Sequence, residues 1–314
     1  MLGLIQITPW HWAGFIVCVL FFLALDLGVF HRKSHVVKFK EALAWTGLWI
    51  TLAVLFGLVI APALVHDWQL QQTVEFITGY VIELSLSMDN VFVIAIIFTH
   101  FAVPERYQHR VLFWGILGAL IMRGLMIWLG VELITRFEWV LIALGAFLVF
   151  SGLKMIFTKD KEADPERNIA VRLTRKIFPV STEFNGQKFL TKLNGRTALT
   201  PLALVLVLVE TTDLIFALDS IPAIFAVTRD AFIVFTSNVF AILGLRSLYF
   251  VLAGAIKYFR YLKVGLSIVL VFIGLKMVLV NYLHIPTPLS LGVVVMIIAG
   301  SILLSVKSAN RGPA

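Results

Sequence analysis

The sequence predicts an all-α polytopic membrane protein, on three observations. Hydrophobic residues occupy 60% of the 314 positions and charged residues only 14%, whereas about a quarter of the residues in a typical soluble domain are charged. The mean hydropathy is +0.96. The hydrophobic residues also gather into runs of roughly 20, the length at which a helix crosses a hydrocarbon core about 30 Å thick.

Nine such runs predict about nine transmembrane helices in a single transmembrane domain, residues 1–314. They lie near residues 10–30, 43–64, 74–98, 110–131, 138–157, 200–227, 231–253, 263–282 and 288–306. No Lys or Arg leads the first run and no small-residue cleavage site precedes His31, so we interpret it as a retained helix rather than a secretory signal. Cys18, the single cysteine, lies in this run, which excludes an intramolecular disulfide.

The basic residues predict the orientation in the membrane. The loops at 31–41, 99–110, 158–198 and 254–263, together with the C-terminal tail, hold 20 Lys and Arg, and the opposite loops hold only Arg136 and Arg229. By the positive-inside rule, the N-terminus lies outside and the C-terminus in the cytoplasm. The net charge of +8 therefore reports topology and attraction to lipid headgroups, and we expect no nucleic-acid partner.

Residues 158–198 form the only sizeable polar segment, which we interpret as a cytoplasmic connector. It contains the charged run KDKEADPER and two Asn-Gly pairs. Around Asn194-Gly195, the run KFLTKLNGRTAL predicts a β-hairpin. A plain linker is favoured over a regulatory loop.

An internal repeat relates residues 74–157 to residues 200–282. In the first run of each unit, two acids lie six residues apart and a small polar residue follows; an arginine recurs in the second run, and GLKM in the third. The matched pairs are Glu83 with Asp213, Asp89 with Asp219, Asn90 with Ser220, and Arg123 with Arg246. Because each unit has three crossings, the second enters the membrane from the opposite side, and such inverted repeats commonly place a transport site near the midplane.

The acids in these runs predict a cation site. An ionised carboxylate at mid-bilayer costs roughly 2.5 kcal/mol or more unless it is paired, hydrated or coordinated. The candidate ligands offer only oxygen atoms, which suits Mn²⁺, Mg²⁺ or Ca²⁺ rather than Zn²⁺ or Cu⁺, and Met88 adds a softer contact that favours Mn²⁺. The candidates are Glu83, Asp89, Asn90, Glu210, Asp213 and Asp219.

The six-residue spacing bears on helix geometry. On a continuous helix Glu83 and Asp89 do not share a face, whereas Glu83 and Asn90, seven apart, do. Either each motif serves two neighbouring polar surfaces or the helix unwinds. Because proline removes a backbone donor, we favour a break around Asp219 and Pro222, and we expect a second one around Asp89.

The acids could instead hold the bundle together by pairing with buried bases. Arg123 and Arg246 lie deep enough either to neutralise an empty acid site or to form permanent structural pairs, and both readings stay open. Lys154 and Lys276 lie near helix ends and are expected to snorkel. Four residues are therefore candidates for gating or counter-charge: Asp26, which could also pair with Arg32 or Lys33, and Arg123, Arg246 and Ser220.

The motif-bearing segments resemble the TerC family of integral membrane proteins. The resemblance rests on DLGVFHRK from Asp26, FITGYVIELSLSMDNVFV from Phe76, LVETTDLIFALDSIPAIFAVTRDAFIVFTSNVFAILGLRSLYF from Leu208 and VFIGLKM from Val271, and it covers essentially all nine runs. The family's acidic pairs map onto Glu83 with Asp89 and onto Asp213 with Asp219; Glu210 and Asn90 match as well. The resemblance implies export of Mn²⁺ across a bacterial inner membrane and, for some relatives, metal supply to secreted enzymes. The family is named for tellurite resistance, but an acid cluster would repel an oxyanion.

Together these features predict a secondary transporter that exports divalent cations, with Mn²⁺ as the expected ion and no permanently bound cofactor. Protonation of one or two carboxylates would couple transport to the proton gradient. The spans lack a phosphate-binding loop, a nucleophile and base pair and a His-containing metal motif, so neither an ATP-driven pump nor an enzyme is expected. The alternative is a membrane scaffold or a tellurite- or pH-stress assembly factor that recruits membrane or cytoplasmic partners through residues 158–198.

Overall fold

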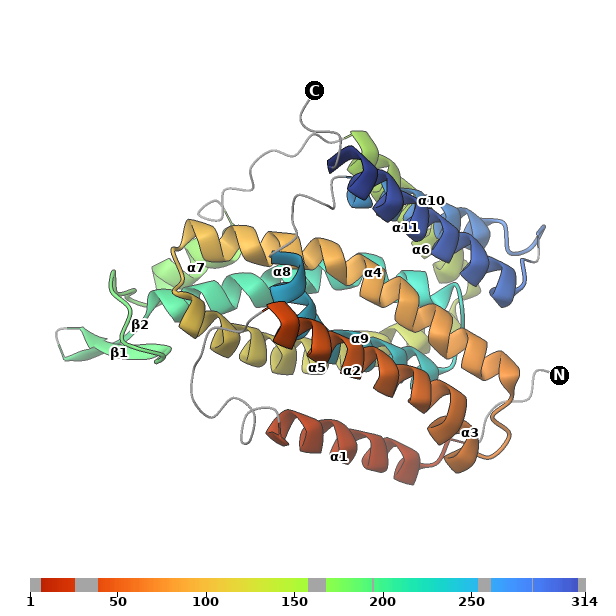
Figure 1. Cartoon of the computed structure of the whole chain (residues 1–314), viewed down its shortest axis with the longest axis horizontal. Helices are drawn as coiled ribbons and strands as arrows, with labels where there is room; N and C mark the ends of the chain where they lie inside the picture. The colour runs from red at the N-terminus through yellow and green to blue at the C-terminus, as the bar shows by residue number, and fades with distance from the viewer. Residues whose placement is uncertain are drawn as a thin grey trace.

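The computed structural model describes residues 7–25, 39–157, 168–193, 195–253, 261–283 and 285–309, and most of them are helical (Figure 1). The elements in chain order are α1 (Pro9–Leu25), α2 (Phe39–Leu55), the π-helix η2 (Phe56–Ile60), α3 (Ala61–Leu64), α4 (Leu70–His100), α5 (Glu105–Arg136), α6 (Glu138–Phe157), α7 (Ile169–Ile177), β1 (Leu190–Leu193), β2 (Arg196–Leu199), α8 (Pro201–Phe225), α9 (Ala231–Ala253), α10 (Leu262–Val278) and α11 (Thr287–Ala309).

The helices confirm an all-α polytopic membrane architecture. Seven helical segments are long and apolar enough to cross a membrane: the continuous segment of α2, η2 and α3, and the helices α4, α5, α6, α8, α9 and α11. The other two predicted runs coincide with α1 and α10, which have 17 described residues each, fewer than the roughly 20 that a crossing needs. Nine crossings therefore stay a prediction.

Both predicted breaks in the motif helices are wrong. The helix α4 is continuous from Leu70 to His100 and α8 from Pro201 to Phe225. Pro222 lies in the last turn of α8, where few hydrogen bonds remain to be lost, and the helix ends three residues later. The hydroxyl of Thr211 donates to the Val207 carbonyl at 2.7 Å, so polar side chains in this helix bond the preceding turn without unwinding it.

The backbone irregularity lies instead in the second predicted run. There the π-helix η2 interrupts the segment between α2 and α3. The Thr73 hydroxyl donates to the Gly57 carbonyl at 2.8 Å, which gives the irregular turn a buried hydrogen-bond partner from α4. The residues of η2 include no proline and no polar side chain that would predict this feature from the sequence.

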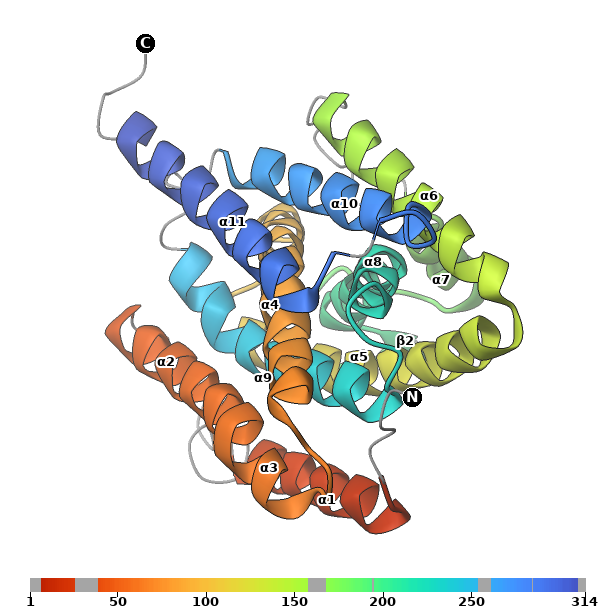
Figure 2. The same cartoon turned by 90° about the vertical axis from the view of Figure 1, so that its right-hand side faces the viewer.

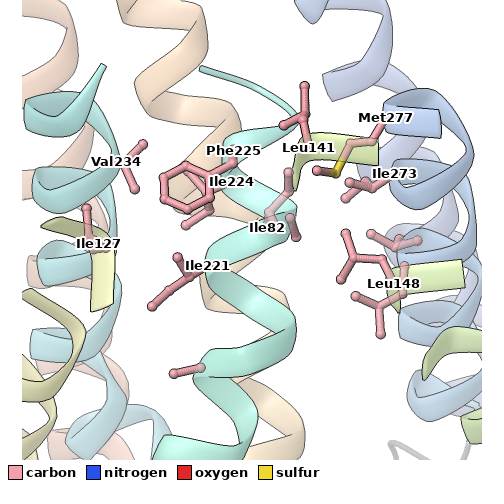
Figure 3. Packing of buried hydrophobic residues seen from close by; sticks show 14 of the residues in the cluster. Ile82, Ile127, Leu141, Leu148, Ile221, Ile224, Phe225, Val234, Ile273 and Met277 are labelled. Atoms are coloured by element: carbon pink, nitrogen blue, oxygen red, sulfur yellow. The ribbon is translucent and has the colours of Figure 1, made fainter. Parts of the chain in front are cut away.

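A central group of helices, α4, α5, α8 and α9, carries the two acid motifs. The helix α4 packs against α9 and α8, and α5 packs against α8 and α9. In Figure 2, α6, α10 and α11 lie on one side of this group and α1 and α2 on the other. Apolar residues join the group to α6 and α10; among them Ile82 of α4, Ile221 of α8, Leu148 of α6 and Ile273 of α10 belong to one buried cluster (Figure 3).

The backbones of α6 and α10 approach closely at glycines. A Cβ built on Gly145 would lie 2.9 Å from the Gly274 carbonyl oxygen, and one built on Gly152 would lie 2.8 Å from the Ser267 carbonyl oxygen. Contacts this short leave no room for a side chain. Small residues at such positions let membrane helices pack through their backbones.

The described part of the connector is folded. Its hairpin is confirmed, with Leu193 opposite Arg196 in the antiparallel register and Gly195 at φ +78° in the turn. The ring centroid of Phe189 lies 6.4 Å from that of Trp114 in α5, and the Thr200 hydroxyl donates to the Lys188 carbonyl at 2.8 Å. The described connector residues therefore pack against α5 and the start of α8, and its role as a plain linker stays a prediction.

We predict that Gly145→Ala lowers the stability of the protein. The added methyl would collide with the backbone of α10, and overpacking of this kind costs roughly 1–3 kcal/mol. Thermal unfolding in detergent measures the effect. The matched control is Gly300→Ala in α11, where a Cβ meets nothing within 4 Å; an equal loss of stability in both variants would contradict the proposed close packing.

Candidate functional site

The centre of the helix bundle is a buried arginine held by two acids. Arg123 of α5 is only 2% exposed. Its Nη1 forms an ion pair with Glu83 of α4. Its Nη2 and Nε donate to the two carboxylate oxygens of Asp213 of α8, at 2.9 and 3.1 Å. This bidentate arrangement is the stronger form of an arginine–carboxylate pair, and it ties three helices together.

Neutral polar side chains complete the hydrogen bonds of this group. The amide of Asn238 in α9 accepts from Arg123 Nη1 at 3.0 Å and donates to Glu83 Oε2 at 3.2 Å. Ser220 accepts from Arg123 Nη1 at 3.2 Å. Ser87 donates to Glu83 at 3.3 Å. Each of the four central helices thus contributes a polar side chain to one network.

Asn90 connects this network to a cavity. Its Nδ2 donates to Asp213 Oδ1 at 3.3 Å. Its other amide atom, Oδ1, is buried and has no hydrogen-bond partner among the described residues. A buried acceptor without a partner costs free energy comparable to a lost hydrogen bond, and here it belongs to a residue that lines the cavity.

The cavity has a volume of about 30 Å³, enough for one or two water-sized occupants. Asp89 and Asp219, the second acids of the two motifs, both line it. Asp219 accepts a hydrogen bond of 2.8 Å from the hydroxyl of Ser151 in α6. The remaining lining residues are Glu83, Leu86, Ser87, Asn90, Arg123, Met155, Phe216, Ser220, Leu266 and Leu270.

Other predicted residues lie outside this cavity. The carboxylate of Glu210 lies against Gly118 of α5, in the space that a Cβ there would fill. Arg246 lines a second cavity, of about 20 Å³, together with Asp213, and its Nη1 lies 3.5 Å from His109 Nε2. Asp26 lies outside the described residues.

The two lysines expected to snorkel lie in the last turns of their helices. Lys154 lies in the last turn of α6. Lys276, in the last turn of α10, donates to the Ser290 hydroxyl at 2.9 Å.

The predicted ligands thus form two overlapping groups, and Glu210 belongs to neither. Arg123 holds Glu83 and Asp213, whereas Glu83, Asp89, Asn90 and Asp219 line the cavity. In the described part of the chain, no three His, Cys, Asp or Glu side chains form a group that could hold a metal ion. A cation in this arrangement would rely on two carboxylates supplemented by amide, hydroxyl or water oxygens.

Three residues of the site escaped the sequence analysis: Asn238, Ser151 and Met155. Asn238 is a polar residue within an apolar run, and Met155 is the last residue of the first GLKM motif. Both features could have identified these residues as candidates for the site. Ser151 carried none, because a serine in a membrane helix usually bonds its own backbone. Met88, the expected soft contact, packs against a hydrophobic cluster instead and does not line the cavity.

A helical integral membrane protein with a buried acid and arginine centre is the class that this fold and site define. The sequence profile of the integral membrane protein TerC family matches residues 68–312, and the chain belongs to this family.

Its relatives are similar over nearly their whole length. The "Uncharacterized membrane protein STKORF319" of Myxococcus xanthus is 51% identical over 308 residues, which cover 98% of this chain and 95% of that protein. The "Putative membrane-bound redox modulator Alx" of Salmonella typhi is 47% identical, and that of Escherichia coli K12 is 46% identical; each match covers 91% of both chains. No solved structure matches the chain.

We predict that Arg123→Met strongly destabilises the protein in the presence of a chelator. Removing the guanidinium leaves Glu83 and Asp213 buried without it, and breaking a buried pair in this way costs roughly 3–5 kcal/mol. Thermal unfolding in detergent measures the loss. The control is Arg136→Met, which removes an exposed ion pair with Glu132 worth at most about 1 kcal/mol. Similar losses in both variants would show that the buried group does not hold the bundle together.

Proposed function

We propose that this protein is a secondary transporter that exports divalent cations from the cytoplasm, with Mn²⁺ as the expected ion. The observation that carries the proposal is the buried Asn90 Oδ1, which has no partner among the described residues and lines a cavity that Asp89 and Asp219 also line. Carboxylate, amide and hydroxyl oxygens are the ligands that hard divalent cations prefer. The Met155 thioether is a softer group that suits Mn²⁺ better than Ca²⁺ or Mg²⁺.

In this proposal the acids have two roles. Asp89, Asn90 and Asp219 bind the ion, with Ser87 and Ser220 as supporting oxygens. Glu83 and Asp213 stay with Arg123, whose charge lowers the electrostatic cost of keeping four carboxylates together in the absence of an ion. A proton that binds to Asp89 or Asp219 competes with the ion, and this competition couples export to the proton gradient.

The inverted repeat is part of the proposal, and helix packing supports it. The repeat matches Gly152 with Gly274 and, seven residues earlier, Gly145 with Ser267. A two-fold axis in the membrane plane would therefore convert the contact of Gly145 with Gly274 into that of Ser267 with Gly152, and both contacts occur. The same operation exchanges the packing of α4 on α9 with that of α8 on α5, and both of these also occur.

In the proposed orientation the cavity lies between the two ends of the membrane helices, because Asp219 and Ser220 line it from the last two turns of α8, which face outside. Met155 lies in the last turn of α6 and Leu266 in the first turns of α10. With the N-terminus outside, as the distribution of Lys and Arg predicts, both of these helix ends face the cytoplasm. A cavity lined from both directions suits a transport site near the midplane, as in other inverted-repeat transporters.

The name of the Alx relatives suggests a redox role, which this chain could fulfil only indirectly. Cys18 is its single cysteine, so thiol–disulfide exchange with a second thiol of the same chain is excluded. Control of a redox-active metal ion such as Mn²⁺ needs no thiol in the protein. The proposed transport activity therefore accommodates the name of these relatives.

A scaffold role is the second candidate, and one surface favours it. The short helix α7 exposes Ile169, Leu173 and Ile177 at a spacing of four residues, next to basic residues. An apolar stripe with basic neighbours suits either a partner protein or the membrane surface. Under this alternative, α7 would be needed for the cellular phenotype and the cavity acids would not.

We predict that Asp89→Asn and Asp219→Asn each reduce Mn²⁺ flux at least tenfold in vesicles that contain the purified protein, because each removes a charged ligand of the ion. The control is Asp67→Asn, which removes an exposed carboxylate at the surface and should leave flux unchanged. Leu173→Ser in α7 should also leave flux unchanged. Normal flux in both cavity variants would refute the transport proposal, and a cellular phenotype lost only in Leu173→Ser would favour the scaffold.

A further inference from the structure

A third, much larger cavity lies away from the acid centre. It has a volume of about 470 Å³ and lies between α1, the segment of α2, η2 and α3, and α9. This volume is in the range of sites that bind small molecules. Its walls are almost wholly apolar and include Phe15, Val19, Phe56, Ile60 and Phe240.

The residues that line the cavity include polar ones at the start of α1 and extend over the depth of one membrane leaflet. Trp10 and His11 line it at the start of α1, and Phe22 lines it twelve residues beyond Trp10. Twelve helical residues span about 18 Å, slightly more than half of a hydrocarbon core about 30 Å thick. At this end of α1, His11 Nε2 lies 3.2 Å from the Leu64 carbonyl oxygen, so α1 and α3 are tied together there.

The π-helix η2 shapes one wall of this cavity. Phe56 and Ile60, the first and last residues of η2, both line it. Gly57 faces the other way, because a Cβ built on it would lie 2.7 Å from the ring of Phe76 in α4. Isolated π-helical turns inside α-helices are frequently found at functional sites, and here the irregular turn lies at the cavity wall.

We propose that this cavity binds one acyl chain of a membrane phospholipid from the outer leaflet, with the headgroup beside Trp10 and His11. An apolar cavity of this size does not favour water. The helices that form it belong to a membrane protein, so lipid acyl chains are the apolar molecules nearest to the cavity. The cavity is as deep as the part of one leaflet that an acyl chain occupies, and its polar residues lie at the end where the headgroup would be. The bound chain would fill the space between α1 and α9. The choice of the outer leaflet rests on the proposed orientation, in which α1 begins outside, but the inference does not depend on cation transport.

Gly14 allows the cavity to be filled without disturbing the fold. It lines the cavity, and a Cβ built on it meets nothing within 4 Å. Gly14→Phe would therefore place a ring in the space proposed for the acyl chain. Gly47→Phe is the matched control, because Gly47 also meets nothing within 4 Å but does not line the cavity.

The experiment uses the full-length protein in vesicles of phosphatidylglycerol whose acyl chain carries a photoactivatable diazirine at its middle. After illumination, mass spectrometry compares the cross-linked peptides that contain Cys18 or Phe56 with those of α11, which serves as the lipid-facing reference. We expect strong labelling at Cys18 or Phe56 in the wild type and in Gly47→Phe, and at least a fivefold lower ratio to α11 in Gly14→Phe.

Two results would overturn the proposal. In the first, Cys18 and Phe56 of the wild type are labelled no more strongly than α11. The cavity would then be occupied by a partner helix or another apolar ligand. The other is an unchanged ratio in Gly14→Phe when that variant elutes as a folded species in size-exclusion chromatography. If Gly14→Phe does not fold, Gly14→Leu adds a smaller side chain at the same position. An unchanged ratio of cavity labelling to α11 labelling in that variant would overturn the proposal in the same way.

Discussion

The ion-pair group of Arg123 with Glu83 and Asp213 is the interaction on which the rest of the structure depends. It joins α5 to both motif-bearing helices at a depth where all three charges are largely removed from solvent. A buried ion is stabilised only when its partners are in place, because the desolvation penalty is several kcal/mol per ion. The helices α4, α5 and α8 are therefore fixed relative to one another, and Asn238 of α9 is bonded to the same group.

This fixed group defines the neighbouring cavity. Asn90 bonds Asp213 through Nδ2, which leaves its Oδ1 buried at the cavity. Glu83 bonds Arg123 and Asn90 bonds Asp213, and these two residues, seven apart, share a face of a continuous α4, whereas Asp89 lies on a different face. The two acids of one motif thus reach different surroundings without any break in the helix. The arrangement separates charge neutralisation from the proposed ion binding.

Much of the fold could be predicted from the sequence, because the length and composition of the apolar runs reflect the thickness of the bilayer. Seven of the nine runs match helices that could cross a membrane, and the Asn-Gly pair marked the hairpin. The predicted breaks failed because Pro222 is too close to the end of α8 to interrupt it. The π-helix η2 depends on tertiary packing against α4, which no local pattern reveals.

The site could be predicted in composition but not in geometry. Acids in apolar runs are energetically costly, so Glu83, Asp89, Asp213 and Asp219 were conspicuous in the sequence. Which acids pair with Arg123 and which line the cavity depends on helix rotation and packing, and these are set by contacts between distant segments. Asn238 and Ser151 joined the site for the same reason, since each bonds an acid from a distant part of the chain.

Metal-dependent thermal stabilisation of the purified protein tests the proposed cation site most directly. A ligand that binds the folded state raises its apparent stability by mass action, by about 2.7 kcal/mol at a hundredfold excess over the dissociation constant. We expect Mn²⁺ to raise the melting temperature of the wild type more than Mg²⁺ or Ca²⁺ does, and to have no effect on a variant that combines Asp89→Asn with Asp219→Asn. A flat response of the wild type to all three ions, or an equal response of the variant, would contradict the assignment of the site.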